Sequence, residues 1–129
     1  MRTRSKVLLI GAGLGIAPIR ALLEDLPCGV DTEVVHRAST RDAAVLHHEL
    51  EALAADRPAT RVHLVTGRRG RSDDVMRPLG PLHLVTLVPD VKGRDVYVCG
   101  PPGLTQGIIE NLRRLGVPGS QVHLESFDL

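Results

Sequence analysis

Runs of aliphatic residues recur along the chain and predict the strands of a sheet. Four of them are nearly continuous in Val, Leu and Ile, as expected for strands that are buried on both faces. These four runs cover residues 6–10, 32–36, 61–66 and 95–100, and a more polar run over 121–127 predicts a fifth strand.

Between these runs, apolar residues recur every three or four positions, which is the spacing of a helix with one buried face. Pro18 suits a first helical turn, where its missing N–H is no loss. Ser39 or Thr40 is the expected N-cap of the next helix, and a pair of arginines followed by Gly116 is typical of a helix C-terminus. The predicted helices cover residues 17–26, 39–55, 81–88 and 104–116.

Strands and helices thus alternate through the chain. This order predicts an α/β fold with a parallel sheet, because right-handed crossovers place helices on both faces. We expect a doubly wound five-stranded sheet in the order 3-2-1-4-5. A length of 129 residues corresponds to one domain, here residues 1–129. The irregular segment 66–80 is basic and contains Arg68, Arg69 and Arg71.

Composition excludes several kinds of function. The 16 basic and 15 acidic residues nearly cancel, and Tyr97 and Phe127 are the only aromatic residues of the Phe, Tyr and Trp type, so we expect no nucleic-acid partner. Cys28 and Cys99 are far apart and lack a metal-binding spacing. The adjacent pair of histidines would point in different directions on a helix. We therefore expect free thiols and no metal site.

The glycine-rich segment between the first strand and the first helix is the most informative motif. Gly11, Gly13 and Gly15 follow the strand and Pro18 opens the helix, in a G-x-G-x-G-x-A-P spacing. Backbone N–H groups and the positive end of the helix dipole favour a phosphate at such a turn. The common G-x-G-x-x-G fingerprint would need a glycine at Ile16. From the residues alone, a methyl-donor loop for adenosylmethionine and a purely packing role of the glycines stay open.

The end of the second strand favours a phosphorylated ribose. His36 and Arg37 stand where an acidic residue would hold the ribose hydroxyls, and a cation there indicates an additional phosphate. The segment YVCGPPG, residues 97–103, ends another strand. It should face the glycine-rich turn, because the carboxyl ends of parallel strands share one crevice. Cys99 alone would predict only a small buried residue.

Three segments, in this order along the chain, resemble the nicotinamide-nucleotide-binding domain of the ferredoxin–NADP reductase superfamily. They are GAGLGIAPIRALLE, HRASTRDAAVLHHELEAL and YVCGPPGLTQGIIENLRRLGVPGSQVHLESF, and the resemblance runs from Lys6 to Phe127. Its nearest branch is that of bacterial ferric-reductase-like flavoenzymes related to NADPH oxidases. The resemblance implies NADPH, or NADH, as the bound cofactor and FAD on a partner domain.

The resemblance assigns residues to three places along the cofactor. The loop that cradles the pyrophosphate is matched by Gly11, Gly13, Gly15, Ile16, Ala17 and Pro18. The place that binds an adenosine 2′-phosphate is matched by Arg37 and Ser39, with Arg41 as a second cation. The Cys-Gly-Pro motif beside the nicotinamide and the strand end beside the flavin are matched by Cys99, Gly100, Pro101, Glu125, Ser126 and Phe127. Of these, Cys99, Glu125 and Phe127 are expected to act in hydride transfer, and Arg68, Arg69 and Arg71 compete for the 2′-phosphate.

One departure from the family is large. The sequence contains neither the antiparallel β-barrel with its flavin motif nor the haem-binding membrane helices of the ferric-reductase-like members. We therefore expect the C-terminal part of a longer flavoenzyme, with an FAD-binding β-barrel domain as partner. Hydride passes to FAD in such an enzyme, and electrons leave for haem, ferric iron or an iron–sulfur centre. The isolated chain should be inactive alone.

The expected location is the cytoplasm, because no apolar run approaches the ~18 residues of a membrane span. The chain is expected there either as a free protein or as the cytoplasmic domain of a membrane protein. Two other functions stay open: a non-catalytic nucleotide-sensing module, and an adenosylmethionine-dependent methyltransferase domain.

Overall fold

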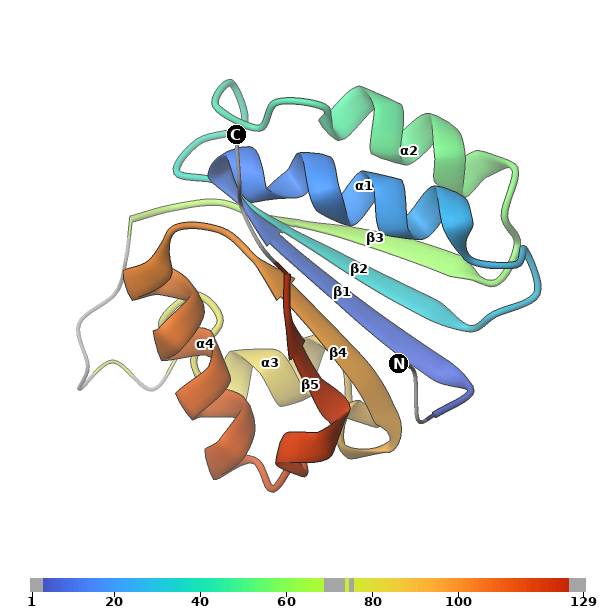
Figure 1. The fold of residues 1–129 in the computed structure, drawn as a ribbon. Coiled ribbons are helices and arrows are strands. Elements are labelled where there is room, and N and C mark those ends of the chain that lie inside the picture. Colours follow the sequence, from blue (N-terminus) through green and yellow to red (C-terminus); the bar gives the residue numbers. More distant parts are fainter. Residues whose placement is uncertain (1–3, 69–73, 75, 126–129) are drawn as a thin grey trace.

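The computed structural model describes residues 4–68, 74 and 76–125, and shows a five-stranded parallel sheet between two layers of helices (Figure 1). The strands run in the order β3-β2-β1-β4-β5, which confirms the predicted order. Their bounds are β1 Lys6–Ala12, β2 Thr32–Arg37, β3 Thr60–Val65, β4 Arg94–Cys99 and β5 Val122–Leu124. Since all strands are parallel, their carboxyl ends lie together at one end of the sheet.

Helices cover both faces of the sheet, as predicted. α1 (Ile16–Asp25) and α2 (His47–Ala55) pack on one face, and α3 (Pro81–Leu87) and α4 (Pro102–Arg114) pack on the other (Figure 1). Within the described residues, short 3-10 turns join the elements at Gly13–Gly15, Val91–Gly93 and Gly119–Gln121. In the part of the chain that the structure describes, none of the helices is long and apolar enough to cross a bilayer.

The central strand β1 shows why its sequence is continuous in aliphatic residues. Leu8 and Ile10 belong to the core shared with α3 and α4, whereas Val7 and Leu9 belong to the core shared with α1 and α2. All four side chains are at most 1% exposed. A strand covered on both faces needs apolar residues at successive positions, because its side chains alternate between the faces.

The second helix begins later than its sequence pattern predicts. Of the helix predicted from Ser39 onward, only His47–Ala55 is helical. The Thr40 hydroxyl accepts a hydrogen bond from the Ala43 amide (3.1 Å), and this local turn competes with the helix. Leu46, with a left-handed backbone (φ 63°), directly precedes α2. The predicted N-cap at Ser39 or Thr40 is therefore wrong.

Other element ends differ by a few residues from the prediction. α4 begins at Pro102, before the predicted start at residue 104, because proline is suited to a first helical turn. β5 is shorter than the predicted 121–127, since Gln121 belongs to the preceding 3-10 turn. Ser126 and Phe127 lie outside the described residues.

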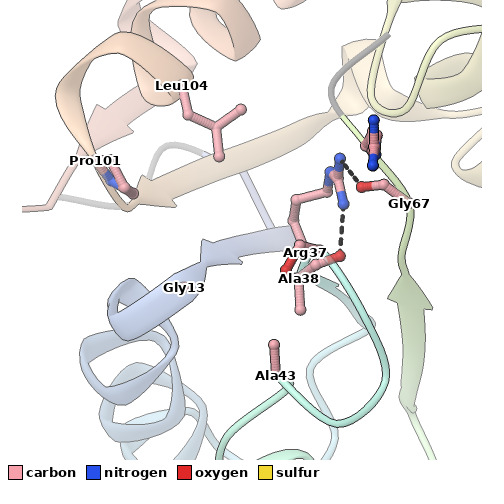
Figure 2. Close-up of a pocket in the computed structure, with 9 residues that line it drawn as sticks. Gly13, Arg37, Ala38, Ala43, Gly67, Pro101 and Leu104 are labelled. Carbon is pink, nitrogen blue, oxygen red and sulfur yellow. Dashed lines mark hydrogen bonds between the residues drawn. The ribbon is translucent and has the colours of Figure 1, made fainter.

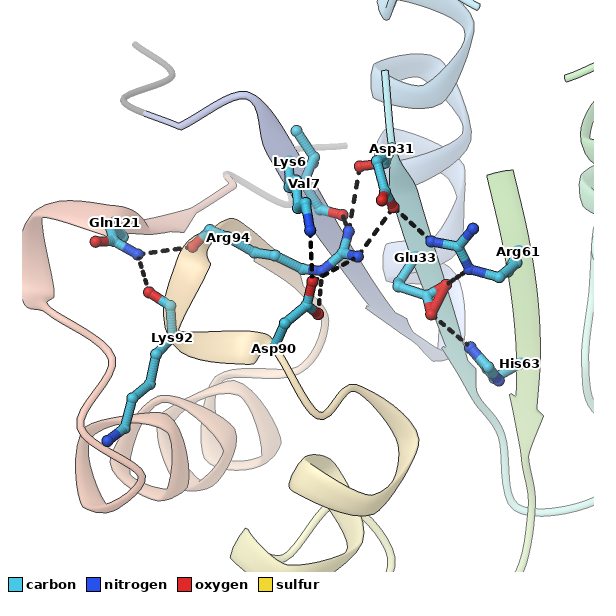
Figure 3. A network of polar contacts seen from close by, with 10 residues as sticks. All are labelled: Lys6, Val7, Asp31, Glu33, Arg61, His63, Asp90, Lys92, Arg94 and Gln121. Atoms are coloured by element: carbon cyan, nitrogen blue, oxygen red, sulfur yellow. Dashed lines mark hydrogen bonds and ion pairs between the residues drawn. The ribbon is translucent and has the colours of Figure 1, made fainter. Parts of the chain in front are cut away.

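A network of charged side chains ties the amino ends of the strands together, at the opposite end of the sheet from the glycine-rich turn (Figure 3). The buried Arg94 guanidinium donates to the carboxylates of Asp90 (2.8 Å) and Asp31 (2.9 Å) and to the carbonyl of Val7 (2.9 Å). It thereby links β4 to the loop before β2 and to β1. Hydrogen bonding from Arg94 is the main cause that lowers the pKa of Asp90 to about 2, and Lys6 contributes.

Candidate functional site

The loops after β1 and β4 touch closely enough to require glycine. A Cβ atom on Gly15 would lie 2.3 Å from the carbonyl oxygen of Cys99. A Cβ on Gly100 would lie 2.9 Å from a side-chain atom of β1, and a Cβ on Gly11 would lie 2.8 Å from Cδ1 of Ile16. Real Cβ atoms do not approach other atoms this closely. Close packing therefore requires glycine at Gly11, Gly15 and Gly100, and their assignment to the cofactor stays a prediction.

Gly13 differs from these glycines because it faces open space. Its φ is 56°, in the left-handed region that favours glycine, and a Cβ there would meet no described atom within 4 Å. The turn leads into α1, where Ile16 is buried, Ala17 is exposed and Pro18 is partly exposed. The amides of the turn and the positive end of the α1 dipole therefore adjoin accessible space. A phosphate group fits this environment.

A pocket of about 370 Å³ opens beside Gly13 at the carboxyl ends of four strands (Figure 2). It combines the turn after β1, the loops after β2 and β3, and the residues that follow β4. Its lining consists of Gly13, Arg37, Ala38, Ser39, Ala43, Gly67, Arg68, Pro101 and Leu104. Crevices of this kind are where open α/β sheets bind their ligands.

Arg37 lies at this pocket, but it is also bound to the protein backbone. Its guanidinium donates to the carbonyls of Ala38 (2.6 Å) and Gly67 (2.7 Å) (Figure 2), and to that of Val65 (3.3 Å). Burial lowers the pKa of Arg37 from its usual value, and the group remains cationic. A guanidinium has five N–H donors, so these three bonds with described residues leave two for a ligand.

Ser39 lies in the pocket lining, whereas Arg41 does not. The Ser39 carbonyl accepts a hydrogen bond from an amide in the loop after β3 (2.9 Å), which fixes the two loops side by side. Arg41 is exposed on the turn before α2. Arg68, which the sequence indicated only as a competitor, is exposed and belongs to the lining. Arg69 and Arg71 are outside the described part of the chain.

Cys99 is the last residue of β4 and is fully buried. It packs among the apolar residues beneath α1, including Ile16. Burial raises the pKa of the Cys99 thiol and the charge of Glu125 adds to this, so the thiol is neutral at pH 7. Glu125 follows β5, where its amide donates to the Val98 carbonyl (2.9 Å). The structure thus brings Glu125 close to Cys99, and Phe127 lies outside the described residues.

A pair of histidines, the buried His36 and the partly exposed His47, supports the loop after β2. Nδ1 of His36 lies 3.0 Å from Nδ1 of His47, the first residue of α2. Nε2 of His47 lies 3.1 Å from the Glu51 carboxylate. Burial lowers the pKa of His36 to about 4, with a contribution from His47. His36 is therefore neutral at pH 7 and holds the start of α2 against β2. The described residues include no cluster of three or more side chains suited to a metal ion.

Known proteins resemble the chain over almost its whole length. The family model for the oxidoreductase NAD-binding domain matches residues 9–110. The glycine betaine monooxygenase reductase subunit of Chromohalobacter salexigens is 30% identical over 129 residues, and the match covers 95% of this chain and 35% of that protein. An NADPH oxidoreductase of Mycobacterium tuberculosis is 34% identical over 125 residues, covering 94% and 31%. The chain thus spans about a third of the length of these relatives.

Similarity of structure agrees with the sequence match. The crystal structure of a flavohemoglobin from Malassezia yamatoensis with bound FAD and heme matches with a TM-score of 0.76 at 22% identity. The match covers 97% of this chain and 32% of that one, and it concerns the fold alone. Membership of the ferric-reductase-like branch stays a prediction. Because the family model spans the glycine-rich turn, the loop after β2 and the loop after β4, the chain belongs to the oxidoreductase NAD-binding domain family, as the resemblance in sequence indicated.

Proposed function

We propose that this chain is the NADPH-binding domain of a larger flavin-dependent reductase. It holds the nicotinamide so that hydride passes to FAD on a partner domain, from which electrons leave for a further acceptor. One observation carries the proposal: in a member of the NAD-binding family, an open glycine turn and a cationic loop line one pocket at the carboxyl ends of β1 to β4.

The turn at Gly13 and the first turn of α1 hold the pyrophosphate in this proposal. Gly13 supplies space for close approach of the backbone, since a Cβ at this position would project into the opening. The amides at the start of α1 and the helix dipole offset the negative charge. Gly15 and Gly11 act indirectly, because their lack of side chains lets the turn pack against β4 and α1.

The loops after β2 and β3 recognise the adenosine 2′-phosphate. Arg37 offers two N–H donors, Ser39 offers a hydroxyl, and Arg68 adds a second cation at the pocket. The end of β2 carries the neutral His36 where NAD-binding folds use an acid, so repulsion of the phosphate is avoided. We therefore propose a preference for NADPH over NADH.

The ends of β4 and β5 position the nicotinamide. Cys99 is neutral and buried, so it does not act as a nucleophile. It provides a compact apolar support under the loop after β4. Glu125 lies beside it and supplies a polar group at the edge of that base. The nicotinamide supplies the hydride chemistry, and these residues fix its orientation.

We infer the FAD-binding domain and the terminal electron acceptor from the length of the relatives and from their names as reductases. The chain covers about a third of proteins named as reductase components or oxidoreductases. We propose an FAD-binding β-barrel in the same parent protein, with haem, ferric iron or an iron–sulfur centre beyond it. The resemblance in sequence favours the ferric-reductase-like branch.

Calorimetric titration of the purified chain tests the proposal. NADPH should bind with one site per chain, NADH more weakly, and adenosylmethionine should give no signal. The chain alone should be colourless and should not oxidise NADPH when ferric salts are added. Binding of adenosylmethionine in place of NADPH, or FAD retained at one equivalent after purification, would contradict the proposal. A parent protein without any flavin domain would favour the nucleotide-sensing alternative.

A further inference from the structure

The turn before α3 is held in a conformation that leucine seldom adopts. Leu79 has a φ of 58°, in the left-handed region that favours glycine. Among the described residues other than glycine, only Leu46 shares this feature. The Leu79 side chain is 1% exposed, so it fills space in the core that glycine would leave empty. A strained backbone of this kind persists only where its surroundings fix it.

Side chains of two helices bind both polar groups of the Leu79 backbone. Its amide donates to Nδ1 of His83 on α3 (2.9 Å), and its carbonyl accepts from Nδ2 of Asn111 on α4 (3.0 Å). A backbone N–H only donates, so Nδ1 of His83 carries no proton. Burial lowers the pKa of His83 and the charge of Arg37 adds to this, so the ring is neutral at pH 7 and Nδ1 stays an acceptor. We call Leu79, His83 and Asn111 the Leu79 anchor.

The Leu79 anchor lies on the same face of the sheet as Arg37. Side chains two positions apart in a strand share a face, so Arg37 follows Val35 onto the face that α3 and α4 cover. Leu79 belongs to the apolar core of that face, together with Val35 and Val65. The guanidinium of Arg37 is also close enough to His83 for its charge to act on the ring. The Leu79 anchor and the cationic end of the pocket are therefore neighbours.

The orientation of Arg37 depends on backbone that rests on this core. Its guanidinium donates to the carbonyls of Val65 (3.3 Å) and Gly67 (2.7 Å), at the end of β3 and in the loop after it. Val65 is 7% exposed and shares the core with Leu79. Protein interiors are close-packed, so a shift of Leu79 would also move the end of β3. The carbonyls that orient the guanidinium would move with it.

We propose that His83 and Asn111 are positioning residues for the recognition of the adenosine 2′-phosphate. They act through Leu79 on the carbonyls that orient Arg37 at the pocket. The inference rests on the proposed function and adds two residues that determine the preference for NADPH without touching the ligand, since neither His83 nor Asn111 lines the pocket. Both residues are partly exposed, so they can be replaced without removing an apolar side chain from the core.

Two replacements of His83 test this role in the purified chain. His83→Leu removes the acceptor for the Leu79 amide, whereas the side-chain oxygen in His83→Asn takes the place of Nδ1. His83→Leu should lower the affinity for NADPH about tenfold through misplacement of the Arg37 guanidinium, and leave the affinity for NADH unchanged. His83→Asn should restore most of the affinity for NADPH. Calorimetry with both cofactors at one ionic strength measures these differences.

Asn111→Ala removes the bond on the other side of Leu79 and gives an independent result if His83→Leu does not fold. It should weaken NADPH binding and spare NADH binding in the same way. Thr86→Val is the matched control, because Thr86 is exposed on the same helix as His83 and donates to the carbonyl of Leu82 (2.7 Å), outside the Leu79 anchor. Both affinities should stay unchanged in this control.

Two results would overturn the proposal. One is an unchanged preference for NADPH in the folded His83→Leu and Asn111→Ala variants. The other is a loss of NADPH and NADH affinity by equal factors, which would show that the Leu79 anchor supports the fold without directing the recognition of the 2′-phosphate.

A double variant tests whether His83 acts through Arg37. In Arg37→Ala the guanidinium is absent, so the addition of His83→Leu should cause no further loss of NADPH affinity. A further loss equal to that of His83→Leu alone would show that His83 acts independently of Arg37, and would overturn the proposal. If the unmodified chain prefers NADPH and the variants of the Leu79 anchor keep that preference, only the positioning role fails. If the unmodified chain does not bind NADPH, or binds it no better than NADH, the proposed recognition of the 2′-phosphate fails as well.

Discussion

Replacement of Arg37 by alanine tests how this chain would distinguish NADPH from NADH. The change removes the cationic guanidinium at the pocket and its three bonds to the carbonyls of Ala38, Val65 and Gly67. A charge-assisted hydrogen bond is worth about 1.5–3 kcal/mol, so NADPH affinity should fall about ten- to a hundredfold. The lost carbonyl bonds should also lower the free energy of unfolding by about 1–3 kcal/mol.

NADH affinity should hardly change in Arg37→Ala, because two backbone hydrogen bonds still hold the loops after β2 and β3 together. The Ala38 amide donates to the Val65 carbonyl (3.0 Å), and the Gly67 amide donates to the Ser39 carbonyl (2.9 Å). The geometry of the pocket should therefore survive the loss of the guanidinium. The effect is then confined to the ligand that carries a 2′-phosphate.

Calorimetry with both cofactors at one ionic strength measures this difference, since salt screens exposed charges. Arg68→Ala and Arg41→Ala serve as comparisons, because Arg68 lies in the pocket lining and Arg41 lies outside it. Equal affinity of the unmodified chain for NADPH and NADH would refute the reasoning. A preference that survives Arg37→Ala and disappears in Arg68→Ala would assign the phosphate to the loop after β3.

Three further predictions concern stability. Gly15→Ala forces a Cβ to within 2.3 Å of the backbone of β4, so it should lower the free energy of unfolding by about 3 kcal/mol or more in chemical denaturation. Gly13→Ala places its Cβ in open space at φ 56° and should lower the free energy of unfolding by only about 1–2 kcal/mol. Equal losses of unfolding free energy in the two variants would contradict the close packing of Gly15 on β4. His36 has a pKa of about 4 in the folded chain against 6.5 when unfolded. The stability that its neutral form contributes should therefore be complete above pH 6.5 and should decline towards pH 4, by on the order of 3 kcal/mol in total. A His36→Leu variant whose free energy of unfolding shows the same decline would exclude this cause. Arg94→Met should destabilise the chain by about 3–5 kcal/mol, because it removes the buried cation that pairs with Asp31 and Asp90. Arg113 pairs with Glu110 on the surface, so Arg113→Met should destabilise the chain by less than about 1 kcal/mol. Similar melting temperatures of the two variants would refute the difference.

The sheet could be predicted because each of its central strands is a continuous aliphatic run in the sequence. A continuous aliphatic run such as 6–10 fits a strand only when both faces are covered, and alternation with helices then restricts the topology. The start of α2 could not be predicted in the same way. Ser39 and Thr40 are good N-cap residues by type, but in the structure the Thr40 hydroxyl closes a separate turn and Leu46 precedes the helix.

The candidate site was predictable in its parts and not in its assembly. Gly13 and Arg37 were found from the turn and from the missing acid at the end of β2. The backbone contacts of Arg37 join two loops that lie 30 residues apart, and no local pattern records them. Leu104 of α4 also lines the pocket, and no local pattern in the sequence indicated this position. The different roles of Gly13 and Gly15 also depend on what each faces across the crevice.

The contact between Gly15 and Cys99 limits how the crevice can move. Backbone atoms of the turn after β1 and the end of β4 touch without intervening side chains, so these two segments shift only as one rigid body. We expect any opening around a ligand at the opposite wall, where the loops after β2 and β3 are joined through Arg37 and exposed at Gly67. The reacting end of the cofactor would thus rest on a fixed base while its adenosine end is admitted and released.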